Sequence, residues 1–77
     1  MKREMILKNR LKEARKQKKL SQEELANMVG VARNTITSIE RGEYSPSAYL
    51  AWLLVEAFGK EEWPFEKLFY MEFVDKN

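Results

Sequence analysis

The sequence predicts an all-α fold of four to five short helices, to which the two ends of the chain could add a small two-stranded antiparallel sheet. Three observations favour this class. The chain has 77 residues, which is enough for one domain with a small core. Apolar residues recur three or four positions apart over most of its length, which is helical spacing. Glycines at 30, 42 and 59 divide this pattern into short segments. We therefore expect residues 1–77 to form one domain.

The helix boundaries are predicted from capping residues and from glycine. Asn9 is a candidate N-cap for the first helix. Ser21 and Glu24 have the spacing of a capping box, in which each side chain binds the backbone N–H of the other residue. Gly30 suits the left-handed conformation that often ends a helix. We expect helices over residues 10–18, 22–29, 33–41, 46–58 and 64–69.

Both ends of the chain contain residues that favour strands. Residues 5–7 form a short apolar run, and residues 69–74 contain aromatic and β-branched side chains, with aromatics at 69 and 73 on one face. We expect the terminal segments, about 1–8 and 69–77, to act as strands and to take part in dimerisation.

The composition excludes most catalytic chemistry. The chain has no cysteine and no histidine, so it lacks thiol nucleophiles, disulfides, and the commonest general base and zinc ligand. It has no glycine-rich phosphate loop either. We therefore expect a protein that is not an enzyme and that holds no metal or cofactor. No apolar run approaches the roughly 18 residues that span a bilayer, and a cytoplasmic location is expected.

The net charge of +2 conceals an uneven distribution. Residues 1–42 carry 11 Lys and Arg against 5 Asp and Glu, whereas residues 43–77 carry 3 against 7. A basic first half indicates a polyanionic partner, and an acidic, aromatic-rich second half indicates a different partner on that side.

The segment 22–41 has the pattern of a helix-turn-helix, two short helices joined by a turn that contains glycine. In its second helix Ile36 and Ile39 lie on one side and predict the core face. The opposite side carries residue types that suit base edges, because Arg pairs with guanine O6 and N7, and Asn with adenine N6 and N7. An ordinary solvated surface is the alternative for this face. We expect base contacts from Arg33, Asn34, Thr37 and Ser38.

Other side chains in the basic half have supporting roles in this interpretation. Gln22 lies in the first turn of its helix, where free N–H groups also bind phosphate. Thr35 and Arg41, near the two ends of the second helix, are further candidates for phosphate contacts. Arg15 and Glu40 lie next to core positions, and we predict an ion pair between them. The alternative is two separately solvated charges.

Residues 21–42 closely resemble the helix-turn-helix of the Cro/CI-type regulators, also called the XRE family. The resemblance extends over about residues 7–69 and is strongest from 20 to 46. It is carried by the runs Ser21-Gln22-Glu23-Glu24-Leu25-Ala26, Gly30-Val31, Thr35-Ile36 and Ile39-Glu40-Arg41-Gly42.

The resemblance implies a lambda repressor-like domain of four or five helices that binds DNA as a repressor or activator, in most members as a homodimer. It implies antiparallel pairing of residues 5–7 with the region 69–74. It also implies an ion pair between Arg15 and Glu40. The DNA-contacting positions of the family fall on Gln22, Arg33, Asn34, Thr37 and Ser38.

Three departures from the family pattern affect the expectations. Ala32 stands where the family usually has a Ser or Thr N-cap, although its methyl group could contact a thymine methyl. Lys19 replaces the glycine that usually follows the first helix. The link at residues 60–64 is longer than usual.

The helix over 46–58 is apolar on nearly every side, and a monomer of this size cannot bury all of it. We therefore expect a two-fold dimer, whereas the alternative is an ordinary core with a few exposed aromatics. The predicted interface consists of Tyr49, Trp52, Leu53, Trp63, Phe65, Tyr70 and Phe73.

The predicted function is that of a homodimeric transcriptional regulator, most simply a repressor. It would read double-stranded DNA at a pseudo-palindromic operator, with residues 33–41 in the major groove. The alternative is an antitoxin, whose acidic half masks a toxin protein while the helix-turn-helix represses their shared operon.

Overall fold

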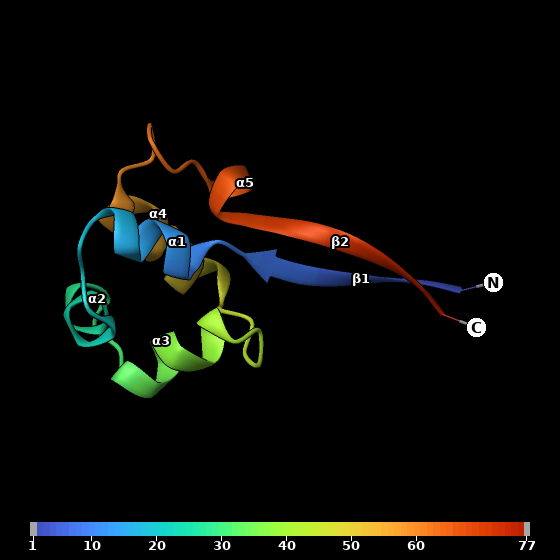
Figure 1. Ribbon diagram of the computed structural model, residues 1–77, viewed down its shortest axis with the longest axis horizontal. Coiled ribbons are helices and arrows are strands. Elements are labelled where there is room, and N and C mark those ends of the chain that lie inside the picture. The colour runs from blue at the N-terminus through green and yellow to red at the C-terminus, as the bar shows by residue number, and fades with distance from the viewer. Residues whose placement is uncertain (1, 77) are drawn as a thin grey trace.

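A computed structural model describes residues 2–76 of the chain (Figure 1). The helices form a globular part, and the two strands leave it together as a ribbon that ends at both chain termini (Figure 1). The prediction of a mostly helical domain with a small antiparallel sheet is confirmed. The elements in chain order are β1 (Lys2–Asn9), α1 (Leu11–Gln17), α2 (Gln22–Val29), α3 (Arg33–Glu40), α4 (Ala48–Phe58), α5 (Phe65–Leu68) and β2 (Phe69–Lys76).

The core lies between all five of these helices and the base of the ribbon. Each helix contributes at least one fully buried apolar side chain, and Phe69 at the start of β2 joins the same cluster. This burial removes apolar surface from water, which is the main stabilising contribution for a chain of this length. One such residue from each helix is Leu11, Leu25, Ile36, Leu54 and Leu68.

The capping signals in the sequence set the helix ends. Ser21 and Glu24 form the predicted capping box, with Ser21 Oγ accepting from Glu24 N at 3.0 Å and Glu24 Oε1 accepting from Ser21 N at 2.8 Å. Gly30 ends α2 with φ +76°, the left-handed conformation expected of it. As a result, each helix begins and ends within two residues of its predicted bounds.

The start of α1 differs from the prediction. The N-cap is Arg10, whose side chain makes no capping hydrogen bond. Asn9 nevertheless satisfies a free N–H of the helix, because its Oδ1 accepts from Leu11 N at 3.0 Å. Its Nδ2 donates to Ile39 O at 2.9 Å and so connects the start of α1 to the end of α3.

Lys19 adopts the left-handed conformation, with φ +59°, at the position where the family usually has glycine. Its β-carbon makes this conformation unfavourable by about 1–2 kcal/mol. The substitution Lys19→Gly should relieve this strain. Because glycine also has more freedom in the unfolded chain, which offsets part of the gain, the free energy of unfolding should rise by only roughly 0.5–1 kcal/mol. Urea unfolding measures the change.

The matched control is Lys16→Gly, which places the same residue inside α1. That variant should lose about 1 kcal/mol because glycine is a poor helix former. Equal changes in the two variants would contradict the assignment of strain to Lys19.

The link after α4 is anchored to the end of α1. Trp63 is only 2 % exposed, and its Nε1 donates to Gln17 Oε1 at 2.7 Å. Lys18 pairs with Glu62, and this hydrogen bond and charge hold the pKa of the Glu62 carboxyl below its usual value. The longer link thus packs against its own chain. The prediction that Trp63 lies in an exposed dimer surface is wrong, because the indole ring fills space inside the monomer.

The ribbon extends beyond the apolar run at residues 5–7 and occupies most of the terminal segments in which strands were expected. β1 and β2 pair antiparallel with Met5 opposite Phe73 and Leu7 opposite Met71, which confirms the expected pairing of the chain ends. Pairing continues through flanking charged residues as far as Lys2 opposite Lys76.

None of the helices in residues 2–76 is long and apolar enough to cross a bilayer.

Candidate nucleic-acid interface

The second helix of the helix-turn-helix, α3, has one buried and one exposed side. Ile36 and Ile39 are fully buried against the core, as predicted. Arg33, Asn34 and Arg41 are exposed on the other side. Thr37, Ser38 and Thr35 are half-buried, so their hydroxyl groups lie at the edge of the exposed surface. The backbone therefore presents polar side chains outward while two isoleucines hold the helix in place.

An ion pair fixes α3 against α1, as the sequence predicted. Arg15 Nε donates to Glu40 Oε2 at 2.7 Å, and only 11 % and 5 % of the two side chains are exposed. Arg15 Nη1 also donates to Leu20 O at 2.8 Å. Because both groups are largely removed from water, the pair sets the position of α3 more strictly than a surface pair could.

Gln22 connects α2 to this pair and to α3. Its Nε2 donates to Glu40 Oε1 at 3.0 Å, and its Oε1 accepts from Thr37 Oγ1 at 3.0 Å and from Arg33 Nε at 3.4 Å. Two of the predicted base-contacting residues are therefore held by a residue that we had assigned to a phosphate. In the free protein Gln22 orients the side chains of α3, which lowers the entropy lost on binding.

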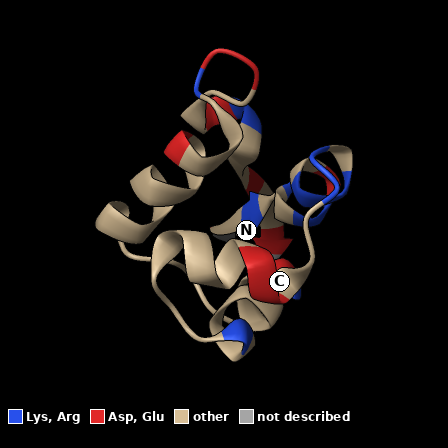
Figure 2. Cartoon of the chain, turned by 90° about the vertical axis from the view of Figure 1, so that its left-hand side faces the viewer, with Lys and Arg blue, Asp and Glu red and all other residues tan. Residues whose placement is uncertain are grey.

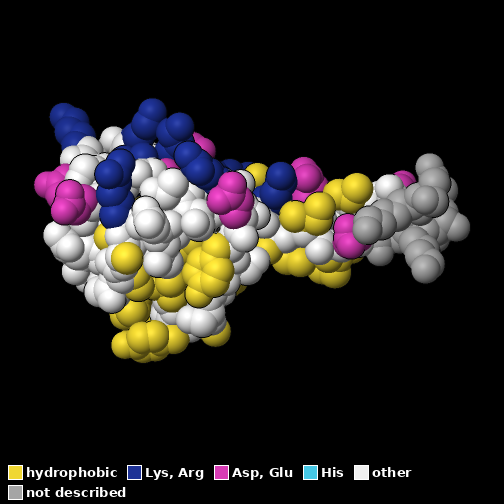
Figure 3. Space-filling view, turned by 90° about the horizontal axis from the view of Figure 1, so that it is seen from below, with side chains coloured by type: hydrophobic (Ala, Val, Ile, Leu, Met, Phe, Trp, Pro, Cys, Tyr) yellow, Lys and Arg dark blue, Asp and Glu magenta, His cyan; other side chains and the backbone are white. Residues whose placement is uncertain are grey.

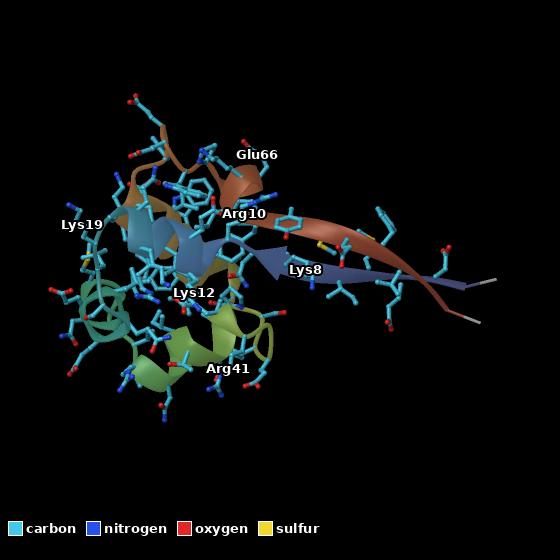
Figure 4. All side chains as sticks on the ribbon, viewed as in Figure 1. Lys8, Arg10, Lys12, Lys19, Arg41 and Glu66 are labelled. Carbon is cyan, nitrogen blue, oxygen red and sulfur yellow. The ribbon has the colours of Figure 1, made fainter. Side chains whose placement is uncertain are left out.

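A polar hollow lies beside α3, between it and α1 and α2. It brings together most of the predicted site and adds Lys12, which we had not singled out as a contact. In Figure 4 Lys12 lies between α1 and α3, and Arg41 lies at the end of α3. The lining residues are Lys12, Arg15, Gln22, Arg33, Asn34, Thr37, Glu40 and Arg41.

The charge distribution around this hollow favours an anionic partner. Figure 2 shows Lys and Arg concentrated on α1, at the right of that view, whereas α4 at the left carries almost no charge. A nucleic-acid backbone that runs along this hollow would place its phosphates close to several of these basic side chains at once. The basic residues of α1 therefore lie together on one side of the molecule.

Tyr44 is a candidate contact that the sequence analysis missed. It lies in the loop after α3 with 47 % of its surface exposed, and it shares a shallow hollow with Asn34, Thr35 and Ser38. An aromatic residue with a hydroxyl group can bind both a sugar and a phosphate. Its position in a loop directly after the exposed helix was the signal available in the sequence.

Ala32 is the N-cap of α3 and, as expected from its methyl group, makes no capping hydrogen bond. Its extended conformation, with φ −74° and ψ 152°, is that of an ordinary N-cap. Ala32→Ser should therefore add a hydrogen bond to a free N–H and raise the free energy of unfolding by about 1 kcal/mol. Thermal or urea unfolding tests this.

The control for that change is Ser47→Ala. Ser47 already caps α4, with Oγ accepting from Leu50 N at 3.1 Å, so its loss should cost about the same amount. A loss of stability on adding the hydroxyl group at position 32 would contradict the expected geometry.

The comparisons with known proteins agree with this architecture. The model of the helix-turn-helix family matches residues 11–62, which include α1 to α4. This chain belongs to that family of DNA-binding transcriptional regulators. The resemblance drawn from residues 21–42 is thereby confirmed. The family is one of regulators rather than of enzymes.

Three relatives of this helix-turn-helix regulator illustrate the similarity. An uncharacterized HTH-type transcriptional regulator of Methanothermobacter thermautotrophicus is 51 % identical over 66 % of this chain and 74 % of its own length. The regulator MJ0272 of Methanocaldococcus jannaschii is 47 % identical over 69 % and 80 %. YgzD of Bacillus subtilis is 41 % identical over 86 % of this chain and 96 % of its own length.

The apolar and aromatic side chains predicted for a dimer interface fall into three groups in this regulator. Tyr49, Trp52, Phe65 and Phe73 are exposed, at 74 %, 57 %, 41 % and 54 %. Leu53 packs against the core with part of its surface exposed, and Tyr70 is half-buried with the Arg10 guanidinium 4.2 Å from its ring centroid. Trp63, as described above, is buried.

Proposed function

We propose that this regulator binds a pseudo-palindromic operator as a homodimer and represses transcription, with α3 of each copy in the major groove. In this proposal residues 1–77 act as one DNA-binding domain in the cytoplasm, where the chromosome is accessible. The observation that carries it is the exposed polar side of α3, held by the pair Arg15–Glu40 next to a basic surface.

In this proposal the polar side chains of α3 and its N-cap residue contact bases in the major groove. Arg33 donates two hydrogen bonds to a guanine, and Asn34 binds an adenine. Thr37 and Ser38 contact neighbouring bases, and the Ala32 methyl group contacts a thymine methyl.

Phosphate contacts position this helix on the duplex. Arg41, Thr35 and Gln22 bind the backbone on both sides of the groove, and the lysines of α1 add a long-range attraction. For Gln22 the proposal uses the second hydrogen of Nε2 as the donor to the phosphate, because Nε2 gives its other hydrogen to Glu40 and Oε1 is the acceptor that holds Arg33 and Thr37. Repression follows when the bound dimer excludes polymerase from an overlapping promoter.

Selection of bound duplexes from a random pool tests this function. We expect an enriched sequence with two inverted half-sites whose centres lie about 10 base pairs apart, the spacing of one helical turn. Enrichment of a single unrepeated element would contradict two-fold binding, and the absence of any enriched sequence at low salt would contradict sequence-specific reading.

A further inference from the structure

The ribbon formed by β1 and β2 has two chemically different faces. Side chains alternate between the faces along each strand. One face carries the cross-strand pairs Met5–Phe73 and Leu7–Met71, and we call it the apolar ribbon face. The opposite face is mixed, because it carries Ile6 and Val74 together with Lys8 and Glu72, whose charged groups lie 3.8 Å apart.

The apolar ribbon face begins in the core and continues outward onto the surface. Phe69, at its base, is buried against α5, and Leu7 packs against the core with part of its surface exposed. Farther out, Met5 and Met71 are 53 % and 45 % exposed. Two consecutive cross-strand pairs are thus apolar on this face, with Phe69 next to them at the base, and the outer part of the face remains in contact with water. A two-stranded ribbon is only marginally stable in water unless such a face is covered.

We propose that the apolar ribbon face binds the same face of a second copy of this chain, so that the two ribbons stack in opposite directions. This proposal rests on the homodimer of the proposed function and names the surface that forms it. From Met5 opposite Phe73 inward to Asn9 opposite Phe69 this face carries no charge, and the next pair outward, Arg3 opposite Asp75, is of opposite sign. Two identical faces therefore meet without like-charge repulsion, as an isologous interface requires.

The shape of the molecule suits this arrangement. The ribbon points away from the globular part, so two ribbons can overlap without a collision of the helices (Figure 1). Eight residues at about 3.3 Å each make the ribbon about 26 Å long, more than half of the 43 Å long axis. A two-fold axis through the stacked ribbons therefore places the globular parts roughly 40 Å apart, close to the 34–36 Å between successive major grooves.

The orientation of α3 agrees with the same axis. α3 lies along one side of the globular part, below the ribbon in Figure 1. A two-fold axis that is perpendicular to the ribbon and points toward that side keeps both copies of α3 on the same side of the dimer. Stacked ribbons would therefore let one straight duplex meet both copies.

The apolar ribbon face alone is too small for a stable dimer, so the interface with the second copy requires an additional contribution from α4. One face of a ribbon this long covers only a few hundred Å², whereas a stable interface buries about 800 Å² per partner. Tyr49 and Trp52 on α4 are highly exposed, and each aromatic side chain can bury about 150–250 Å². Figure 3 shows hydrophobic side chains along the lower edge of the globular part and of the ribbon, and a further group on the upper edge of the ribbon. The end of one ribbon can therefore reach the α4 aromatics of the other copy.

Met5 and its neighbour Ile6 provide a matched test, because both are exposed apolar residues of β1 and they point to opposite faces. Met5→Lys places a charge in the proposed interface and should raise the dimer dissociation constant roughly 100-fold or more. Ile6→Lys places it opposite Glu72 and should leave dimerisation unchanged. Sedimentation equilibrium at micromolar concentrations measures both, and far-ultraviolet circular dichroism verifies that the helices are retained.

A wild-type monomer, or an equal effect of the two lysine variants, would overturn the proposal. A second measurement does not depend on disrupting the ribbon. The chain has no cysteine, so Met5→Cys and Ile6→Cys each introduce the only thiol. A short bismaleimide should link Met5→Cys chains into covalent dimers and leave Ile6→Cys chains unlinked, and the reverse pattern would contradict the assignment of the face.

The experiments distinguish a failure of the DNA-reading function from a failure of the ribbon interface. If the dimer forms through the ribbon but no duplex is enriched, the DNA-reading function is wrong and the interface stands. If Met5→Lys stays dimeric and still prefers the two-fold operator, the function stands and the ribbon interface is wrong. If the wild-type ribbon binds a different protein from a cognate operon in preference to its own copy, the proposal is overturned in favour of the antitoxin alternative.

Discussion

Replacing Glu40→Ala is expected to cost about 3–5 kcal/mol of unfolding free energy, the largest effect of any single change outside the apolar core. The substitution leaves Arg15 charged and largely buried without its partner, and it removes the acceptor of Gln22 Nε2. A domain of this length has a total stability of about 4–11 kcal/mol. The variant should therefore be partly unfolded at 37 °C, which urea unfolding monitored by Trp fluorescence will show.

The control for this change is Glu43→Ala, an exposed acidic residue three positions later, which should change stability by less than about 0.5 kcal/mol. A double-mutant cycle with Arg15→Ala should give strong non-additivity, because the second substitution removes the charge that the first one strands. Additive effects would mean that the two side chains do not act as a pair.

Replacing Arg33→Ala is expected to weaken binding to the selected operator by about 1–3 kcal/mol, or roughly 5–150-fold. The physical reason is the loss of two hydrogen bonds to one guanine, so preference at that base pair should relax while preferences at other positions remain. Fluorescence anisotropy with the operator and with single-base variants measures both effects at constant salt.

Two further variants separate base reading from general attraction. Arg33→Lys keeps the positive charge but cannot form the bidentate contact, so it should relax the same base preference. Lys16→Ala, in α1, should instead weaken all sequences alike and reduce the salt dependence by about one counterion. Full retention of base preference in Arg33→Lys would indicate that Arg33 binds a phosphate.

The sequence was most informative where local chemistry determines structure. The capping box at Ser21 and Glu24, the left-handed Gly30 and the alternating residues of the strands depend on neighbours a few positions away. The pair Arg15–Glu40 could also be anticipated, because both residues lie next to core positions on helices that must meet.

Contacts between distant segments were the part that the sequence could not supply. Nothing near Trp63 indicates that Gln17, 46 positions earlier, would accept from its indole N–H. The contact from Asn9 to the carbonyl of Ile39 and the position of Tyr44 beside α3 depend in the same way on tertiary packing. In the second half of the chain, which is acidic and rich in aromatic residues, the sequence does not distinguish a buried aromatic side chain from an exposed one. Trp63 was for this reason assigned to the surface.

A protein–DNA double-mutant cycle tests most directly whether α3 reads bases. Each guanine of the selected operator is replaced in turn by 7-deazaguanine, which lacks the N7 acceptor, and binding is measured for wild type and for Arg33→Ala. At one guanine in each half-site, we expect the wild type to lose about 1 kcal/mol or more and Arg33→Ala to lose almost nothing. Equal losses in the two proteins at every guanine would show that Arg33 does not contact a base and would contradict the placement of α3 in the major groove.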